Sequence, residues 1–316
     1  MSVNAIPEGH SSIAPRLVVR DPVQALEFYA RAFGATDSVR QADSSGRTHY
    51  AQFRIGHALV MLAEQGEGPG WSNLSPDQIG GSPVMVHIYV PDVDALASNA
   101  VAAGAKLVRP IKDEDRGDRV CTVLDPFGHR WMVATRQRDV SLDVQRQRAP
   151  EWKIQETEKS PARTAPEERL AVPYLAVHAG PKAIEFYKHA FGAAETLRFE
   201  DDRGRIGHCT LTIGDSLLFL SDEFAGICSS PKTLGGTSVL LHLYTEDVDE
   251  VVAGAVAAGA KVLIPVKDQF YGDRAGRLED PYGHIWAIAT HREDVSAEEM
   301  RLRGEAWAAQ QRATRQ

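Results

Sequence analysis

The stretch DPFGHRWMVAT, Asp125–Thr135, returns almost unchanged as DPYGHIWAIAT, Asp280–Thr290. When both copies are extended to Ser141 and Ser296, ten of the seventeen aligned residues are identical. The two copies are 155 positions apart, whereas the repeats of solenoid proteins have periods of about 20–50 residues. An offset of this size indicates the duplication of a whole domain.

Other segments repeat with nearly the same offset. VQALEFYARAFGA begins at Val23 and PKAIEFYKHAFGA at Pro181, while HIYVPDVDALASNAVAAGAKLVRP begins at His87 and HLYTEDVDEVVAGAVAAGAKVLIP at His242. The first pair is offset by 158 residues and the second by 155, so half one carries three extra residues between them. The loop EQGEGPGWSNLSPDQ is the place we expect for them. The chain is therefore interpreted as two tandem copies of one domain.

The bulk composition excludes several classes of protein. Of the 316 residues 25% are charged and 43% hydrophobic, as in ordinary globular proteins, and the net charge is −8. This acidity argues against nucleic acid or an anionic membrane as the main partner. No apolar run approaches the roughly 18 residues that span a bilayer, and the N-terminus lacks the features of a signal peptide. Three cysteines at non-equivalent positions form no disulfide framework, so we expect a cytoplasmic protein.

Each copy is predicted to contain a strand, a helix and three strands, and then the same series again. Asp21–Pro22 and Asp92 are helix-start signals, and Gly34 and Gly104 are helix-stop signals. A polar, proline-bearing segment between the copies is typical of a linker. We expect four parts: domain 1 over 12–139, a linker over 140–170, domain 2 over 171–294 and a C-terminal helix over 295–316.

The motifs FY..AFG, DVD...A.AAGA and DP.GH.W, present in both copies, resemble the vicinal oxygen chelate superfamily, which includes glyoxalase I, extradiol dioxygenases and bleomycin-resistance proteins. The sequence YGDR, Tyr271–Arg274, is similar to the PhnB-like branch of that group. The resemblance covers Ser12–Asp139 and Ala171–Asp294. It implies an α+β fold with two tandem domains, each of two βαβββ modules that form a concave mixed sheet with helices on the outer face.

The resemblance also implies where a metal ion would bind. Metal-using members take His, Gln or Glu ligands from four strands that line the concave face. None of the equivalent positions here carries such a ligand, so we expect neither a metal ion nor a cofactor in the usual place. The positions are Ala14 and Val172, Met85 and Leu240, Met132 and Ala287, with the fourth-strand position near Met61 and Phe219.

Side chains alternate across a strand, so residues two positions from a lost ligand face the same cleft. This parity predicts an apolar and aromatic lining with few polar groups, which suits a small organic molecule. His208 matches a histidine common in the PhnB-like pattern, and Tyr50 takes its place in half one. Arg16 and Arg130 share the face. The expected ligand-binding residues are Met85, His87, Tyr89, Arg119, Met132, Tyr174, Leu240, His242, Tyr244, Tyr271 and Arg274.

Several of these motifs have a simpler structural interpretation. DPFG and DPYG are tight turns, because proline presets φ and glycine allows a positive φ. Trp131 and Trp286 are expected in the core, and FY is expected to pack the first helix on the sheet. Arg119 and Arg274, in the repeated GDR, either form a structural ion pair or anchor a carboxylate or phosphate of a ligand.

Three functions are compatible with these observations. The first is a metal-free protein that binds a small hydrophobic or aromatic molecule, as bleomycin-resistance proteins do. The second is a lyase, isomerase or dioxygenase with a rebuilt site, in which His208, His242 and Tyr244 do acid–base work. The third, an interaction module, has no specific support. We expect the ligand in half two, although an exchanged pairing would build each cleft from both halves. One chain should mimic the dimer of single-domain relatives, and further homodimerisation stays open.

Overall fold

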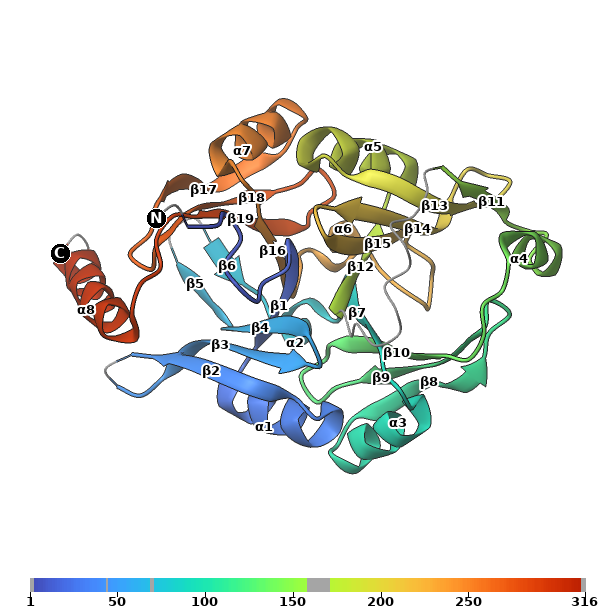
Figure 1. Cartoon of the computed structure of the whole chain (residues 1–316), viewed down its shortest axis with the longest axis horizontal. Helices are drawn as coiled ribbons and strands as arrows, with labels where there is room; N and C mark the ends of the chain where they lie inside the picture. Colours follow the sequence, from blue (N-terminus) through green and yellow to red (C-terminus); the bar gives the residue numbers. More distant parts are fainter. Residues whose placement is uncertain (1–2, 44, 69–70, 158–170, 314–316) are drawn as a thin grey trace.

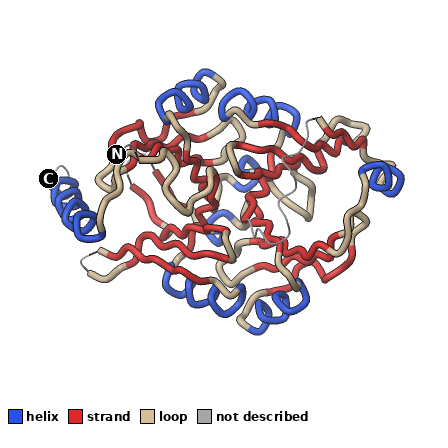
Figure 2. Tube along the Cα trace, in the orientation of Figure 1, coloured by secondary structure: helices blue, strands red, loops and turns tan. Residues whose placement is uncertain are grey.

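The computed structural model describes residues 3–43, 45–68, 71–157 and 171–313. Two large curved sheets lie side by side, with α1, α3, α5 and α7 on their outer faces and α4 and α8 at opposite ends of the molecule (Figures 1 and 2). Each sheet is built from strands of both halves of the chain. The expected α+β fold with two tandem repeats is therefore confirmed, and the exchanged pairing is the one that the molecule uses.

The first sheet has eight strands and combines the beginning and the end of the chain. Its two parts join where β1 pairs antiparallel with β16, with Ala14 opposite His242. In spatial order the strands are β17 (Lys261–Asp268), β18 (Asp273–Glu279), β19 (Ile285–His291), β16 (Val239–Tyr244), β1 (Ile13–Val19), β4 (Ala58–Glu64), β3 (Thr48–Ile55) and β2 (Thr36–Ala42).

The second sheet has nine strands and uses the middle of the chain. Here β7 of half one pairs antiparallel with β12 of half two, with His87 opposite Val172. In spatial order the strands are β11 (Lys153–Glu156), β13 (Ala194–Glu200), β14 (Ile206–Ile213), β15 (Ser216–Asp222), β12 (Ala171–Val177), β7 (Val84–Tyr89), β10 (Arg130–Arg136), β9 (Asp118–Leu124) and β8 (Lys106–Asp113).

Helices hold the two sheets against each other. Within half one α1 packs on α3, and within half two α5 packs on α7, although the strands that follow these helices belong to different sheets. A small hairpin, β5 (Gly66–Gly68) and β6 (Trp71–Asn73), contains the extra residues of half one. The helices are α1 (Pro22–Phe33), α2 (Pro76–Ile79), α3 (Val93–Ala102), α4 (Leu142–Arg148), α5 (Gly180–Phe191), α6 (Pro231–Leu234), α7 (Val248–Ala257) and α8 (Ala297–Ala313).

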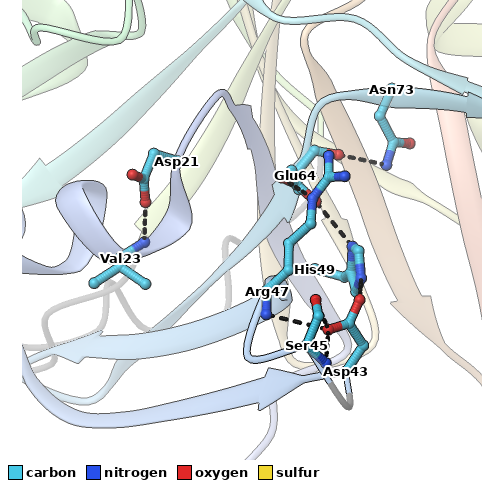
Figure 3. A network of polar contacts seen from close by, with 8 residues as sticks. All are labelled: Asp21, Val23, Asp43, Ser45, Arg47, His49, Glu64 and Asn73. Carbon is cyan, nitrogen blue, oxygen red and sulfur yellow. Dashed lines mark hydrogen bonds and ion pairs between the residues drawn. The ribbon is translucent and has the colours of Figure 1, made fainter.

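Acidic side chains fix the local turns of the first module (Figure 3). The Asp21 carboxylate accepts the backbone N–H of Val23 at 2.9 Å and so caps α1, as its position before Pro22 predicts. The Asp43 carboxylate closes the β2–β3 turn by accepting the N–H of Ser45 at 2.8 Å. His49 then bridges Asp43 and Glu64, at 2.8 Å from each. These contacts set the register of an exposed hairpin.

A buried carboxylate organises the repeated DPxGH motif. Asp125 accepts the Tyr29 hydroxyl at 2.7 Å and the Trp131 indole N–H at 2.9 Å, and its other oxygen accepts the N–H groups of Phe127 and His129, both at 2.9 Å. Asp280 makes the same four bonds in half two. The aspartate thus ties the first helix, the last strand and the turn between strands into one unit. Both tryptophans are fully buried, which confirms their expected place in the core.

The histidine of the same motif joins the two sheets. His129 Nε2 lies 2.9 Å from the carbonyl oxygen of Val18 in β1, and His284 Nε2 lies 3.1 Å from that of Ala176 in β12. Each histidine stands in one sheet and its carbonyl partner in the other. Gly128 and Gly283 have φ of 86° and 88°, so the expected tight turns are present and require glycine. Within the described residues no helix is long and apolar enough to cross a membrane.

We expect the substitution Asp125→Ala to lower the free energy of unfolding by about 3–5 kcal/mol, because it leaves several buried donors without an acceptor. Urea denaturation would measure this loss. The exposed Asp202→Ala is the matched control and should change stability by no more than about 0.5 kcal/mol. Equal effects of the two substitutions would contradict the role given to Asp125.

An isolated half one, residues 1–157, should form a homodimer. Alone it leaves the inner edges of β1 and β7 unpaired, and a second copy offers the same strands that half two provides in the chain. Sedimentation equilibrium of this fragment beside the full chain would test the expectation. A well-folded, monomeric half would show that the exchanged pairing is not needed.

Candidate functional site

The concave face of the nine-stranded sheet, here called the nine-stranded cleft, holds a cavity of about 750 Å³. Half one supplies its wall through β7, β9 and β10, and half two through β12, β14 and β15. A volume of this size is typical of small-molecule pockets. Its main lining residues are Met85, Arg116, Thr122, Arg130, Met132, Trp152, Ile154, Tyr174, Phe199, His208, Ser221, Phe224, Ile227 and Cys228.

Tyr174 and His208 form a hydrogen-bonded pair in this wall. The Tyr174 hydroxyl lies 2.9 Å from His208 Nδ1, and His208 Nε2 lies 3.0 Å from the Thr210 hydroxyl. Burial, with the nearby charge of Arg116, lowers the pKa of His208 to about 3. Burial also raises the pKa of Tyr174 well above its ordinary value. At neutral pH the pair is therefore an uncharged imidazole next to an uncharged phenol.

His87 lies at the floor of the same cleft. Its ring is 4% exposed and meets Tyr89 and Phe219 edge to face, with centroids 4.8 and 5.5 Å away. Burial lowers its pKa to about 3, and its buried Nδ1 has no hydrogen-bond partner among the described residues. The Tyr89 hydroxyl is engaged by Asp118 at 3.0 Å, and Asp118 also pairs with Arg136 at 2.8 Å. The floor thus combines an uncharged, buried imidazole with an ion pair that fixes the Tyr89 hydroxyl.

The charged groups of the nine-stranded cleft gather at its rim. Arg116 pairs with Glu114 at 2.7 Å, and Arg109 and Lys112 approach the same carboxylate at 3.6 and 3.8 Å. Arg130 differs, because its guanidinium donates to the carbonyl oxygen of Ile227 and has no ion-pair partner within the described ranges. The positive charge of Arg130 is therefore available to pair with an anionic group of a ligand in the cavity.

The described part of the predicted linker contributes to the wall of the cavity. α4 and β11 both lie within residues 140–170, and β11 joins the sheet beside β13 (Figure 1). From this segment Trp152 lies over β14, where a Cβ on Gly207 would come within 2.3 Å of its ring. Glycine at 207 therefore makes room for the indole. Parity arguments missed Trp152 and Phe199, since polar linker composition and an edge strand carry no periodic signal for them.

The concave face of the eight-stranded sheet, here called the eight-stranded cleft, is built differently. His242 is 6% exposed, and its Nδ1 lies 3.3 Å from the Arg16 guanidinium. The Tyr244 hydroxyl donates to Asp273 at 2.9 Å, and His291 contacts the same carboxylate at 2.8 Å. Burial would lower the pKa of His291, but its bonds to Asp273 and Asp294 outweigh this and raise it.

The N-terminal segment covers part of the eight-stranded cleft. Ile6 packs on Tyr244, Ala275 and Ala289, and the ring of His10 meets that of Tyr244 at 5.6 Å. The backbone N–H of His291 donates to the carbonyl oxygen of Ala5 at 3.0 Å. Tyr271 lies in the same region, and burial raises its pKa to about 12.

The grouping of site residues predicted from the sequence is corrected in one respect. Tyr174 and His208 lie in the nine-stranded cleft with Met85, His87, Tyr89 and Met132. The eight-stranded cleft instead holds Leu240, His242, Tyr244 and Tyr271, together with Arg16 and Tyr50 from half one. A single site made of half two alone does not exist, because the first strand of each half pairs with a strand of the other.

Arg119 and Arg274 are also corrected, because they do not face the clefts. Arg119 forms a two-point ion pair with Asp94 of α3, at 2.7 and 2.8 Å. Arg274 does the same with Asp249 of α7, at 2.6 and 2.8 Å. Each arginine has the strand parity of neighbours that face the helices, such as Cys121 and Leu278. The structural ion pair, and not the ligand anchor, is the interpretation that the geometry supports.

The residues present do not fit the metal site of metal-using relatives. Around the nine-stranded cleft the four positions hold Val172, Met85, Met132 and Phe219, which offer at most thioether sulfur. In the eight-stranded cleft they are Ala14, Leu240, Ala287 and Met61. Within the part of the chain that the structure describes, no three His, Cys, Asp or Glu side chains cluster closely enough to hold a metal ion.

Comparisons with known proteins place both halves in one family. The family model described as Glyoxalase/Bleomycin resistance protein/Dioxygenase superfamily matches residues 11–133 and 169–288. An uncharacterized protein of Mycobacterium bovis is 37% identical over 144 residues, which are 45% of this chain and 92% of that protein. An uncharacterized protein of Arabidopsis thaliana is 28% identical over 124 residues, 37% of this chain and 74% of its own length.

Solved structures share the fold at low sequence identity. Glyoxalase I from Zea mays superposes with a TM-score of 0.56 at 17% identity, over 87% of this chain and 90% of that one. A putative dioxygenase from Bacillus subtilis gives 0.52 at 12% identity, over 89% and 85%. Likeness at this level concerns the fold alone. From the matches of the family model to both repeats, the chain belongs to the glyoxalase/bleomycin resistance protein/dioxygenase superfamily.

Proposed function

We propose that the protein binds a small, mainly aromatic organic molecule in the nine-stranded cleft, without a metal ion. The observation that carries this proposal is the cavity of about 750 Å³, in which methionine and aromatic side chains form an apolar surface beside a group of charged side chains. Pockets that bind drug-sized molecules combine such apolar walls with a few fixed polar groups. Flat rings would stack against Trp152 and Phe199, and the methionines adapt to irregular shapes.

A few polar groups would orient the ligand. Arg130 offers a guanidinium that has no ion-pair partner among the described residues, and Thr122 and Ser221 offer hydroxyl groups in the wall. His208 and Tyr174 are neutral and already bonded to each other, so they contribute a hydrogen bond without a charge. This arrangement favours a ring system with one polar or weakly anionic substituent near Arg130.

Acid–base catalysis by His208, His242 and Tyr244 has weaker support. A general base works best when its pKa lies near the working pH, and burial holds the pKa of His208 at about 3. Burial and the charge of Asp273 raise the pKa of Tyr244, whose hydroxyl is occupied by that carboxylate. Because His208 and His242 lie in different sheets, the three residues do not act on one substrate.

The finer placement in the PhnB-like branch is part of this proposal. His208 supports it, since the histidine common in that pattern stands in the cavity wall. The YGDR motif supports it less directly, because Arg274 holds the β18 strand to α7 and contacts no cleft. The YGDR motif would thus be a structural feature shared within the branch, whereas His208 would be a feature of its ligand pocket.

Binding can be tested with the neutral naphthalene dye Prodan, whose fluorescence rises in apolar pockets. We expect saturable binding at one site, unchanged after dialysis against EDTA. Trp152→Ala should raise the Kd about tenfold, since it removes a ring worth about 1.4 kcal/mol of contact. Tyr50→Ala, the matched control in the eight-stranded cleft, should leave the Kd unchanged. Equal weakening by both variants, or loss of binding with EDTA, would overturn the proposal.

The neutral state of His208 predicts a pH dependence of stability. An unfolded histidine takes up a proton near pH 6.5, but the folded His208 does so only near pH 3. Between these values the unfolded state binds more protons, so stability falls as the pH is lowered. His208→Phe should reduce this slope by about 1 kcal/mol per pH unit between pH 6 and 4. The exposed His57→Gln should not, and urea titrations of both variants would check it.

A further inference from the structure

We propose that the eight-stranded cleft is a second ligand site, which binds the oxyanion group of a small organic anion through Arg16, Arg277 and His242. The proposal is independent of the function assigned to the nine-stranded cleft. It rests on the position of two arginines that face this cleft, and on buried donors of Arg16 and His242 that have no hydrogen-bond partner among the described residues.

Two arginines from different halves face the same cleft. Arg16 stands on β1 and Arg277 on β18, at positions whose parity matches Ala14 and Ala275 on the concave side. Their guanidiniums are near enough to interact. Burial first, and then the positive charge of Arg16, lower the pKa of Arg277 to about 10. The fold thus holds two like charges in a partly desolvated space.

Arg16 lacks a carboxylate partner. Within the described ranges no acidic side chain lies within ion-pair distance of it. Its guanidinium contacts His242 Nδ1 at 3.3 Å and the Met61 sulfur at 3.7 Å, and it lies 5.2 Å from the centre of the Tyr50 ring. All three neighbours are neutral. Removing a guanidinium from water without a counter-charge is unfavourable, so an anion that pairs with this partly buried group would stabilise the arrangement.

The donors that an anion needs are already present. Since a guanidinium only donates, His242 Nδ1 accepts from Arg16, and the proton of this neutral ring sits on Nε2. Burial, followed by the charges of Arg16 and His10, keeps the pKa of His242 well below its ordinary value, which maintains this state. Both His242 Nε2 and Arg16 Nε are buried and have no partner among the described residues. Buried donors usually have a hydrogen-bond partner, so these two are available to an acceptor on a ligand.

The carboxylate of Asp273 also lies on this face, but it is paired with residues other than the two arginines. Asp273 accepts the Tyr244 hydroxyl at 2.9 Å and the His291 ring at 2.8 Å, so its oxygens are occupied. Arg277 contacts the neutral amide oxygen of Asn73 at 3.5 Å. The ligand should also carry an apolar part, because Tyr50 and Tyr271 flank the arginines.

The nine-stranded cleft, which is built from the equivalent strands of the duplicated domain, can be compared with this site position by position. At the positions equivalent to Arg16 and Arg277 the nine-stranded cleft has Tyr174 and Thr122, which are neutral. The two clefts share strand order and parity, yet only the eight-stranded cleft places paired arginines on these positions. The halves have therefore diverged to select different ligands, an uncharged or weakly charged ring in one and an anion in the other.

The experiment measures stabilisation of the full chain by three probes: inorganic phosphate, phenyl phosphate and benzoate, at an ionic strength held constant with NaCl. We expect a saturable rise in Tm, with the two aryl anions binding more tightly than inorganic phosphate. Arg16→Gln and Arg277→Gln should each weaken binding at least tenfold. Arg16→Gln should also raise the Tm without ligand, because it removes an uncompensated charge. Arg203→Gln, an exposed arginine that lines neither cleft, is the matched control and should bind the anions as the natural protein does.

Three results would overturn the proposal: no saturable shift with any probe, unchanged affinity in both Arg16→Gln and Arg277→Gln, or an equal loss in Arg203→Gln. Stabilisation by inorganic phosphate alone would overturn the assignment of an organic ligand. Prodan titration of Arg16→Gln separates this site from the proposed function, since the dye should bind this variant normally. Arg16→Lys keeps the charge without the Nε donor and should bind with intermediate affinity.

Discussion

Two antiparallel strand pairings, β1 with β16 and β7 with β12, are the constraint on which the rest of this structure depends. Each joins the first module of one half to the second module of the other, so neither half has a complete sheet of its own. Both clefts consequently mix residues of the two repeats. The two modules of one half lie in different sheets. The buried Asp125 and Asp280 connect them, because each bonds to the first helix and to the last strand of its own half.

Much of the fold could be predicted from local patterns in the sequence. The repeat of DPxGH indicated the duplication, and period-two alternation placed Met85, His87 and Met132 on a concave face, where they lie. The same alternation placed Trp131 on the helix side. Such predictions succeed because they depend on one strand at a time: the pleat decides which face a side chain occupies, whatever strand lies beside it.

The partner of each strand could not be predicted in this way. The pattern of β12 is equally suited to β7 or β16, so Tyr174 was grouped with His242 although they line different clefts. Arg119 stands directly after a turn, where the parity of the strand is not yet evident, and its pairing with Asp94 required the position of α3. Trp152 belongs to a segment whose polar composition suggested only a linker, yet it lines a cavity. These errors all concern contacts between segments distant in sequence.

The exchange also has a consequence for the order in which the protein assembles on the ribosome. The nine-stranded sheet uses one continuous stretch, from β7 to β15, whereas the eight-stranded sheet needs both ends of the chain. β4 ends at residue 64 and β16 begins at 239, a difference of 175 residues. At roughly 5–20 residues per second, translation takes about 9–35 seconds to cover it. During that time the middle of the nascent chain can form the nine-stranded sheet. The edge of β1 that later pairs with β16 stays unpaired and is accessible to chaperones.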